Sequence, residues 1–193
     1  MGKGRLEAFS DGVLAIIITI MVLELRPPHE TDWNALLHLL PVMVSYILSF
    51  IFVGIYWNNH HHLLMLVQKI TGPILWANLH LLFWLSLVPF VTAWIGEHPH
   101  ASLPLAAYGV VLLGAGVAFY ILCQCLVSVH GKESTIAKAF GRDAKGVASV
   151  AIYAVAVPVA FVLPWLSYSL YVLVALLWLV PDKRVENIIT KKA

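Results

Sequence analysis

Near the start of the chain lies the stretch Arg5-Leu-Glu-Ala-Phe-Ser-Asp-Gly-Val-Leu-Ala-Ile-Ile-Ile-Thr-Ile-Met-Val-Leu-Glu24. As one α-helix rising about 1.5 Å per residue, it is long enough to cross a bilayer. Polar groups nevertheless occupy it, with Ser10 and Asp11 near one end and Thr19 further in. Polar and ionisable groups are costly at membrane depth, so they indicate a role in function or assembly beyond simple anchoring.

The composition of the whole chain agrees with a membrane location. Of its 193 residues, 61% are hydrophobic and 11% are charged, whereas soluble domains are about half apolar and about a quarter charged. We therefore predict an all-α integral membrane protein whose partner is the lipid bilayer, and we expect no nucleic-acid partner. Acidic Glu7 and Asp11 stand where a cleavable signal peptide carries basic residues, which favours a permanent first span.

Apolar runs separated by polar or proline-containing turns predict six transmembrane helices in a single domain, residues 1–193. Consecutive prolines, Pro27 and Pro28, end the first run because proline cannot continue a helix. The turn signal Leu163-Pro-Trp-Leu-Ser167 divides the last long run in two. The expected spans are 5–25, 33–60, 73–95, 105–129, 147–163 and 167–180.

The distribution of cations tests this topology. Six spans place both termini on one side, and cytoplasmic loops carry an excess of Lys and Arg. With both termini in the cytoplasm, Arg26 alone of the 12 basic residues lies outside. The inner ones are Lys3, Arg5, Lys69, Lys132, Lys138, Arg142, Lys145, Lys183, Arg184, Lys191 and Lys192.

A helical wheel at about 100° per residue divides the first span into stripes. One stripe holds bulky aliphatic side chains interrupted by the hydroxyl of Thr19, and a neighbouring stripe begins with Asp11. Aliphatic residues at helical spacing are also what lipid-facing or core packing requires. The wheel alone leaves both interpretations open for Phe9, Gly12, Ile16, Thr19, Ile20 and Leu23.

The inner end of the first span predicts a polar network. Arg5 and Asp11 are six residues apart and do not face each other on one helix, so the carboxylate needs a partner elsewhere. The topology places His60 and His61 at the same membrane face. We expect hydrogen bonds from Ser10 and Asp11 to a histidine, which would fix how the first helix sits.

A metal site at the histidine cluster is the competing interpretation. Histidine and aspartate are good zinc ligands, and an intramembrane metalloenzyme built on His60–His62, or a non-conducting scaffold, is the alternative function. Consecutive histidines on one helix point about 100° apart and cannot converge on one ion, which favours the hydrogen-bond network. The motifs Gly-x-Ser-x-Gly and His-Glu-x-x-His do not occur in the sequence, so we expect no enzyme and no metal.

Several motifs together resemble a known family. The first span carries Arg5-x-x-x-Phe9-Ser10-Asp11, then Ala15-Ile16, Thr19 and Leu23-Glu24, and the later matches are Tyr56-Trp57, His60-His61, Trp76-x-Asn78-Leu79 and Pro89-Phe90-x-Thr92. This pattern resembles the transmembrane protein 175 family, the lysosomal potassium channels and their prokaryotic relatives. The resemblance is concentrated in residues 5–96.

The resemblance implies a potassium-selective leak channel that lacks a pore loop. In this family the first helices of the assembled subunits line the pore. A chain with one six-span set resembles the prokaryotic form, which implies a homotetramer in a bacterial plasma membrane, with potassium ions as the permeant species and no cofactor. The animal relatives suggest proton permeation as a further alternative.

Site residues follow from the same resemblance. Ile16 matches the hydrophobic constriction, Leu23 matches a second apolar ring with Ile20 between them, and Thr19 matches the layer linked to potassium selectivity. The residues that match the inner network are Arg5, Ser10, Asp11 and one of His60 and His61.

Overall fold

The computed structural model describes residues 2–29, 31–140 and 143–179 of the chain. Every regular element within these ranges is a helix, which confirms the all-helical prediction. The helices are α1 (Lys3–Leu23), α2 (Trp33–His38), α3 (Leu40–Met65), α4 (Gly72–Ser86), α5 (Val88–Glu97), α6 (Ser102–His130), α7 (Thr135–Phe140), α8 (Ala144–Val159) and α9 (Pro164–Leu179).

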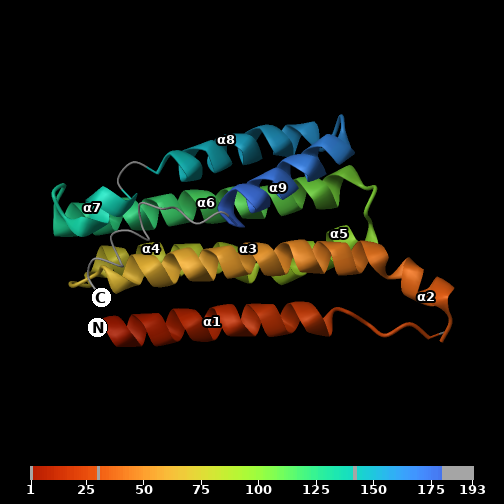
Figure 1. The fold of residues 1–193 in the computed structure, drawn as a ribbon, viewed down its shortest axis with the longest axis horizontal. Helices are drawn as coiled ribbons and strands as arrows, with labels where there is room; N and C mark the ends of the chain where they lie inside the picture. The colour runs from red at the N-terminus through yellow and green to blue at the C-terminus, as the bar shows by residue number, and fades with distance from the viewer. Residues whose placement is uncertain (1, 30, 141–142, 180–193) are drawn as a thin grey trace.

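The long helices run side by side, with α1 along one edge of the bundle (Figure 1). Helix α1 packs against α3, α4 and α5, whereas α8 packs against α6 and α9 on the far side. Helix α1 therefore has neighbours from its own chain on one side only, among the residues that the structure describes.

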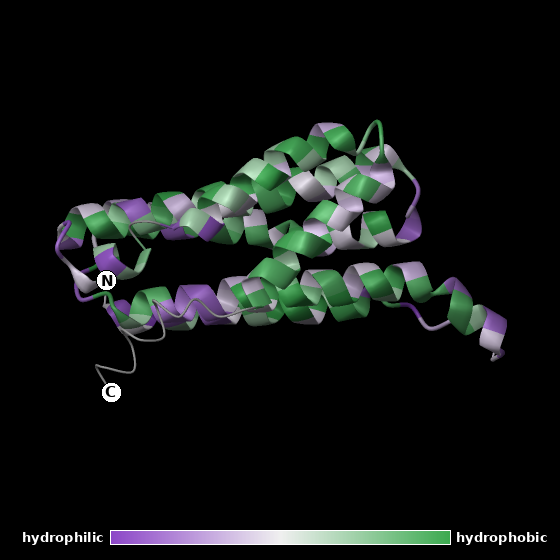
Figure 2. Cartoon of the chain, turned by 45° about the horizontal axis from the view of Figure 1, so that its top comes forward, coloured by the Kyte–Doolittle hydropathy of each residue, from purple (hydrophilic) through white to green (hydrophobic). Residues whose placement is uncertain are grey.

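Four of the helical segments are long and apolar enough to cross a bilayer: α1, α3, the α4–α5 pair and α6. Figure 2 shows polar residues concentrated towards the two ends of the bundle, as expected for a protein that spans a membrane. Helices α8 and α9 have 16 residues each and form a shorter apolar hairpin, so the count of six spans stays a prediction. Val180, the end of the last expected span, lies outside the described residues. So do five of the predicted inner cations: Arg142, Lys183, Arg184, Lys191 and Lys192.

Local chemistry sets several helix ends. The Asp32 carboxylate accepts a hydrogen bond from the backbone N–H of Ala35 at 2.8 Å and caps α2, and Asp143 caps α8 through Gly146 N–H at 2.8 Å. Helix α6 ends at His130 because Gly131 adopts φ 89°, a left-handed conformation that favours glycine. This end of α6 lies at the same end of the bundle as the start of α1 (Figure 1).

The expected third span, 73–95, consists of two helices. Helix α4 stops at Ser86 and α5 restarts at Val88, with Pro89 in its first turn. Proline lacks a backbone donor and clashes with the preceding turn, so it is favoured where a helix begins and costly within one. The Thr92 hydroxyl lies 2.7 Å from the Ser49 hydroxyl, which ties α5 to α3.

Glycine permits a close contact between α4 and α6. A Cβ atom added at Gly114 of α6 would collide with the Trp84 ring of α4. A Cβ atom added at Gly54 of α3 would meet nothing within 4 Å. The two glycines therefore form a matched pair for testing this helix contact.

We predict that Gly114→Ala destabilises the protein by about 1–3 kcal/mol, because the new methyl group overpacks the contact with Trp84. Gly54→Ala should be neutral or slightly stabilising, because alanine favours a helix by roughly 0.5–1 kcal/mol over glycine. Thermal unfolding of both variants in the same detergent measures the difference. Equal unfolding temperatures would contradict the close contact.

Candidate functional site

Helix α1 presents two different faces. One face packs into the protein, and its residues recur every three or four positions, as one side of an α-helix requires. Each of its side chains is 3% exposed or less. The buried residues are Leu6, Ser10, Leu14, Ile17 and Met21.

The second face is left uncovered by this chain. Ile16 is 58% exposed, Ile20 is 42% exposed and Leu23 is 76% exposed, and Thr19 between them is also exposed. These are the four residues that the sequence assigned to the constriction and to selectivity. A continuous apolar stripe with one hydroxyl therefore faces away from the core of this chain.

The hydroxyl of Thr19 has a defined orientation. Its Oγ1 donates a hydrogen bond to the carbonyl oxygen of Ile16 at 2.9 Å, within the same helix. A hydroxyl has one hydrogen and two acceptor lone pairs. Because the hydrogen is used inside the helix, the oxygen is available on the uncovered face as an acceptor for water or a ligand for a cation.

A buried chain of hydrogen bonds joins α1 to α3 through α4. His60 Nε2 donates to Asn78 Oδ1 at 2.7 Å, and Asn78 Nδ2 donates to Ser10 Oγ at 3.0 Å. Ser10 Oγ donates in turn to the Leu6 carbonyl at 2.9 Å. Ser10 and Asn78 are 0% exposed and His60 is 2% exposed. Since an amide oxygen only accepts, His60 must carry its proton on Nε2.

A second, exposed chain runs beside the buried one. The Trp57 indole Nε1 donates to Asp11 Oδ1 at 3.1 Å, and the His61 ring stacks on Trp57 with 5.9 Å between ring centroids. The partner of the Asp11 carboxylate in this structure is therefore an indole, and His61 reaches Asp11 only through that ring.

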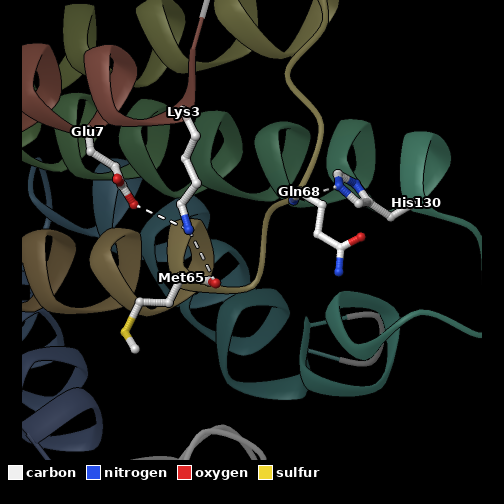
Figure 3. A network of polar contacts seen from close by, with 5 residues as sticks. All are labelled: Lys3, Glu7, Met65, Gln68 and His130. Atoms are coloured by element: carbon white, nitrogen blue, oxygen red, sulfur yellow. Dashed lines mark hydrogen bonds and ion pairs between the residues drawn. The ribbon is translucent and has the colours of Figure 1, made fainter. Parts of the chain in front are cut away.

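The start of α1 has a further attachment. Lys3 Nζ donates to the carbonyl oxygen of Met65, at the end of α3, over 3.3 Å, and lies 3.7 Å from a Glu7 carboxylate oxygen (Figure 3). Arg5 is exposed, and no ion pair of its guanidinium is seen within the described residues. The structure thus brings Ser10, His60, Asp11 and His61 to the α1–α3 contact and leaves Arg5 apart from it.

Two residues of the site were not among the predicted site residues. Asn78 is the central link of the buried chain, and Trp57 is the partner of Asp11. Both occur in the motifs quoted above, and Asn78 is a lone amide within an apolar span, which was the available signal. Within the described ranges, no group of three or more His, Cys, Asp or Glu side chains is arranged to hold a metal ion.

Comparison with known proteins places this arrangement in a family. The chain is 52% identical over 187 residues to a protein named a potassium channel from Chryseobacterium sp. strain P1-3, with 97% of each chain covered. Residues 5–89 match the family described as endosomal/lysosomal potassium channel TMEM175. The chain belongs to the TMEM175 family.

A solved structure supports the TMEM175 assignment. The crystal structure of a lysosomal potassium-selective channel TMEM175 homologue from Chamaesiphon minutus superposes with a TM-score of 0.80 at 29% identity, covering 92% of this chain and 96% of that one. The human endosomal/lysosomal proton channel TMEM175 is 25% identical over 118 residues, which are 58% of this chain and 23% of the human protein. The segment that matches the TMEM175 family includes α1, α3 and α4, which contribute both hydrogen-bonded chains.

We predict that Asn78→Leu destabilises the protein by about 1–3 kcal/mol, because it leaves the His60 Nε2–H buried without an acceptor. Ser10 Oγ loses the donor Asn78 Nδ2 but keeps its bond to the Leu6 carbonyl. The matched control is Asn59→Leu, since the Asn59 amide donates to the Ile55 carbonyl of its own helix, at 2.8 Å, rather than to another helix. Thermal or chemical unfolding in detergent compares the two. Equal losses of stability in the two variants would show that the buried chain of hydrogen bonds contributes no more than one local hydrogen bond.

Proposed function

We propose that this protein is a potassium-selective leak channel in which four subunits place their α1 helices around a central pore. The observation that carries the proposal is the uncovered face of α1, with Ile16, Thr19, Ile20 and Leu23, on a helix whose other face is anchored. Membership of the TMEM175 family and the names of the bacterial relatives support it.

In this arrangement each pore level receives one side chain from each subunit, because closed cyclic symmetry repeats every position. Four Ile16 side chains form a narrow apolar neck that gates by dewetting, and Ile20 and Leu23 extend it outward. The four Thr19 oxygens form one polar layer in this apolar stretch. They replace part of the hydration shell of a potassium ion, and their fixed orientation favours one ion size.

A groove beside the pore face is a candidate contact site for a neighbouring subunit. A groove of about 480 Å³ lies between α1 and the α4–α5 break. Ile16 and Ile20 form one wall, and Pro89 and Phe90 form the other. In a homotetramer, this groove receives the adjoining α1, so the same stripe contributes to the pore and to the contact between subunits.

The proposed orientation follows from the charges. The end of the bundle with the start of α1 carries Lys3, Arg5, Lys69 and Lys138, which suits the cytoplasmic side of a bacterial plasma membrane. The two hydrogen-bonded chains then lie towards the inner half of α1, and Glu24 lies at the outer mouth.

The test of conduction uses purified protein in potassium-loaded vesicles diluted into sodium medium, with a protonophore to supply the counter-charge. We expect potassium efflux, read as proton uptake, that protein-free vesicles lack. Absence of efflux while valinomycin still empties the vesicles would favour a non-conducting scaffold.

We predict that Ile16→Ala raises the basal potassium efflux severalfold, because a wider and less apolar neck wets more readily. The matched control is Val155→Ala on α8, since Val155 is also a β-branched residue and is 57% exposed, close to the 58% of Ile16. The same vesicle assay measures both variants. An unchanged rate for Ile16→Ala, or an equal rise for Val155→Ala, would remove Ile16 from the constriction.

For selectivity, we predict that Thr19→Val reduces the preference for potassium over sodium, because it keeps the side-chain shape and removes the oxygen. Thr19→Ser keeps the oxygen and should retain the preference. Reversal potentials between potassium and sodium solutions measure the ratio. Identical reversal potentials for Thr19→Val and the unchanged protein would exclude the hydroxyl layer as the selectivity element.

Proton permeation is the second candidate function, because several vertebrate relatives are named proton channels. The same vesicles, with equal potassium on both sides and a pH gradient alone, distinguish it. Proton flux without a protonophore would show a proton pathway in this chain.

A further inference from the structure

His130, the last residue of α6, binds the connection between α3 and α4 (Figure 3). The backbone N–H groups of Gln68 and Lys69 both donate to His130 Nε2, at 3.2 Å each. Nε2 must therefore be an unprotonated acceptor. The other ring nitrogen, Nδ1, lies 2.9 Å from the Leu126 carbonyl oxygen and donates its hydrogen to it. The contacts thus select one neutral tautomer of the ring.

The two amides need this acceptor because α3 has just ended. The N–H groups of Leu66 and Val67 bond back to the carbonyls of Leu63 and Leu64, at 3.2 and 3.0 Å. The N–H groups of the next two residues, Gln68 and Lys69, donate instead to the imidazole of His130 on α6. Since Gly131 stops α6 directly after His130, the ring stands at the helix end, facing this turn.

The same turn holds the start of α1. Met65, directly before it, gives its carbonyl oxygen to Lys3 Nζ at 3.3 Å, and Lys3 lies 3.7 Å from Glu7 in the next turn of α1. Leu66 and Val67 are buried, which attaches the turn firmly to the core. A continuous set of contacts therefore runs from His130, through residues 65–69, to the inner end of α1 (Figure 3).

We propose that His130 is a positioning residue for the pore helix: its neutral ring holds residues 65–69 and, through Lys3, the inner end of α1, and protonation from the cytoplasmic side releases them. The proposal rests on the proposed function, in which α1 lines the pore. An imidazolium carries a hydrogen on both nitrogens, so Nε2–H would point at two N–H donors and both hydrogen bonds would be lost. Histidine is the side chain whose charge ordinarily changes between about pH 5 and 8.

Other titratable groups on the surrounding elements must be distinguished from His130. Carboxylates ordinarily titrate at lower pH and lysines at higher pH than histidine, so the responses of the α3 histidines must be separated from that of His130. Comparison of the unchanged protein with His130→Gln does this for all of them. The charged and histidine side chains on these elements are Lys3, Arg5, Glu7 and Asp11 on α1, His60, His61 and His62 on α3, Lys69 in the turn, Lys132 and Glu133 after α6, and Lys138 on α7.

The first test records potassium current in inside-out membrane patches while the cytoplasmic solution changes from about pH 7.5 to about pH 5.5, across the histidine range. We expect the current of the unchanged protein to fall severalfold, because a released α1 lets the apolar neck collapse. His130→Gln, whose amide oxygen accepts hydrogen bonds but does not titrate, should carry similar current at both values. His130→Ala should carry the reduced current at both.

Two histidine controls complete the set. His62→Gln on α3 and His98→Gln in the α5–α6 connection should both keep the pH response of the unchanged protein. A response that persists in His130→Gln, or that disappears in His62→Gln, would overturn the proposal.

The second test does not depend on conduction. Amide hydrogen exchange of a peptide covering residues 66–71, corrected for the intrinsic pH dependence, should show protection at about pH 7.5 that is lost at about pH 5.5. His130→Gln should keep it at both. Equal protection in the unchanged protein at both values would overturn the proposal, as would a loss of protection with unaltered current. Loss of protection in a protein that conducts at no pH would instead refute the proposed channel function.

Discussion

The buried chain Ser10–Asn78–His60 is the constraint on which the arrangement of α1 depends. Inside an apolar bundle an unpaired polar group costs several kcal/mol, so these three side chains must meet one another. Ser10 can face Asn78 in only one rotation of α1, because a shift of one residue turns the helix by about 100°. Once that rotation is fixed, Ile16 and Leu23 must lie on the uncovered face.

The division between neutral and charged groups at this contact also has a physical reason. The buried chain contains no carboxylate, whereas the Asp11 carboxylate stays exposed, beside the Trp57 indole. Moving a carboxylate into a low-dielectric interior carries a large desolvation penalty that a single indole donor cannot offset. The exposed pair therefore adds a second directional contact between α1 and α3 without burying a charge.

The sequence supports some of these features better than others. The helical class follows from composition and apolar run length. The wheel placed Ile16, Thr19 and Leu23 on one stripe of α1 because that depends on local periodicity, but it left open whether the stripe faces lipid, the core or a pore. Asn78 and Trp57 could not be assigned as partners, since the wheel reports a residue's side of its own helix and not the residue opposite it. The sequence did not predict the break between α4 and α5 at Leu87, because Pro89 is compatible with either one kinked helix or two helices. The hydrogen bond between Thr92 and Ser49, which favours two helices, joins residues far apart in the sequence. Pore residues remain predictions because a single chain presents a face without the subunits that would complete it.

Directional contacts are distributed unevenly along α1, and this bears on how a pore formed from it would move. The Lys3 attachment, the buried chain and the Asp11 contact all fall between Lys3 and Asp11. Beyond Asp11, the buried face consists of Leu14, Ile17 and Met21, whose packing is non-directional and tolerates small shifts. The N-terminal third of α1 therefore sets its rotation, while the stretch that carries Ile16 and Leu23 is held by non-directional packing. In the proposed pore, a small tilt about the N-terminal end of α1 would displace Ile20 and Leu23 most, and it would widen or close the apolar neck without breaking a buried hydrogen bond.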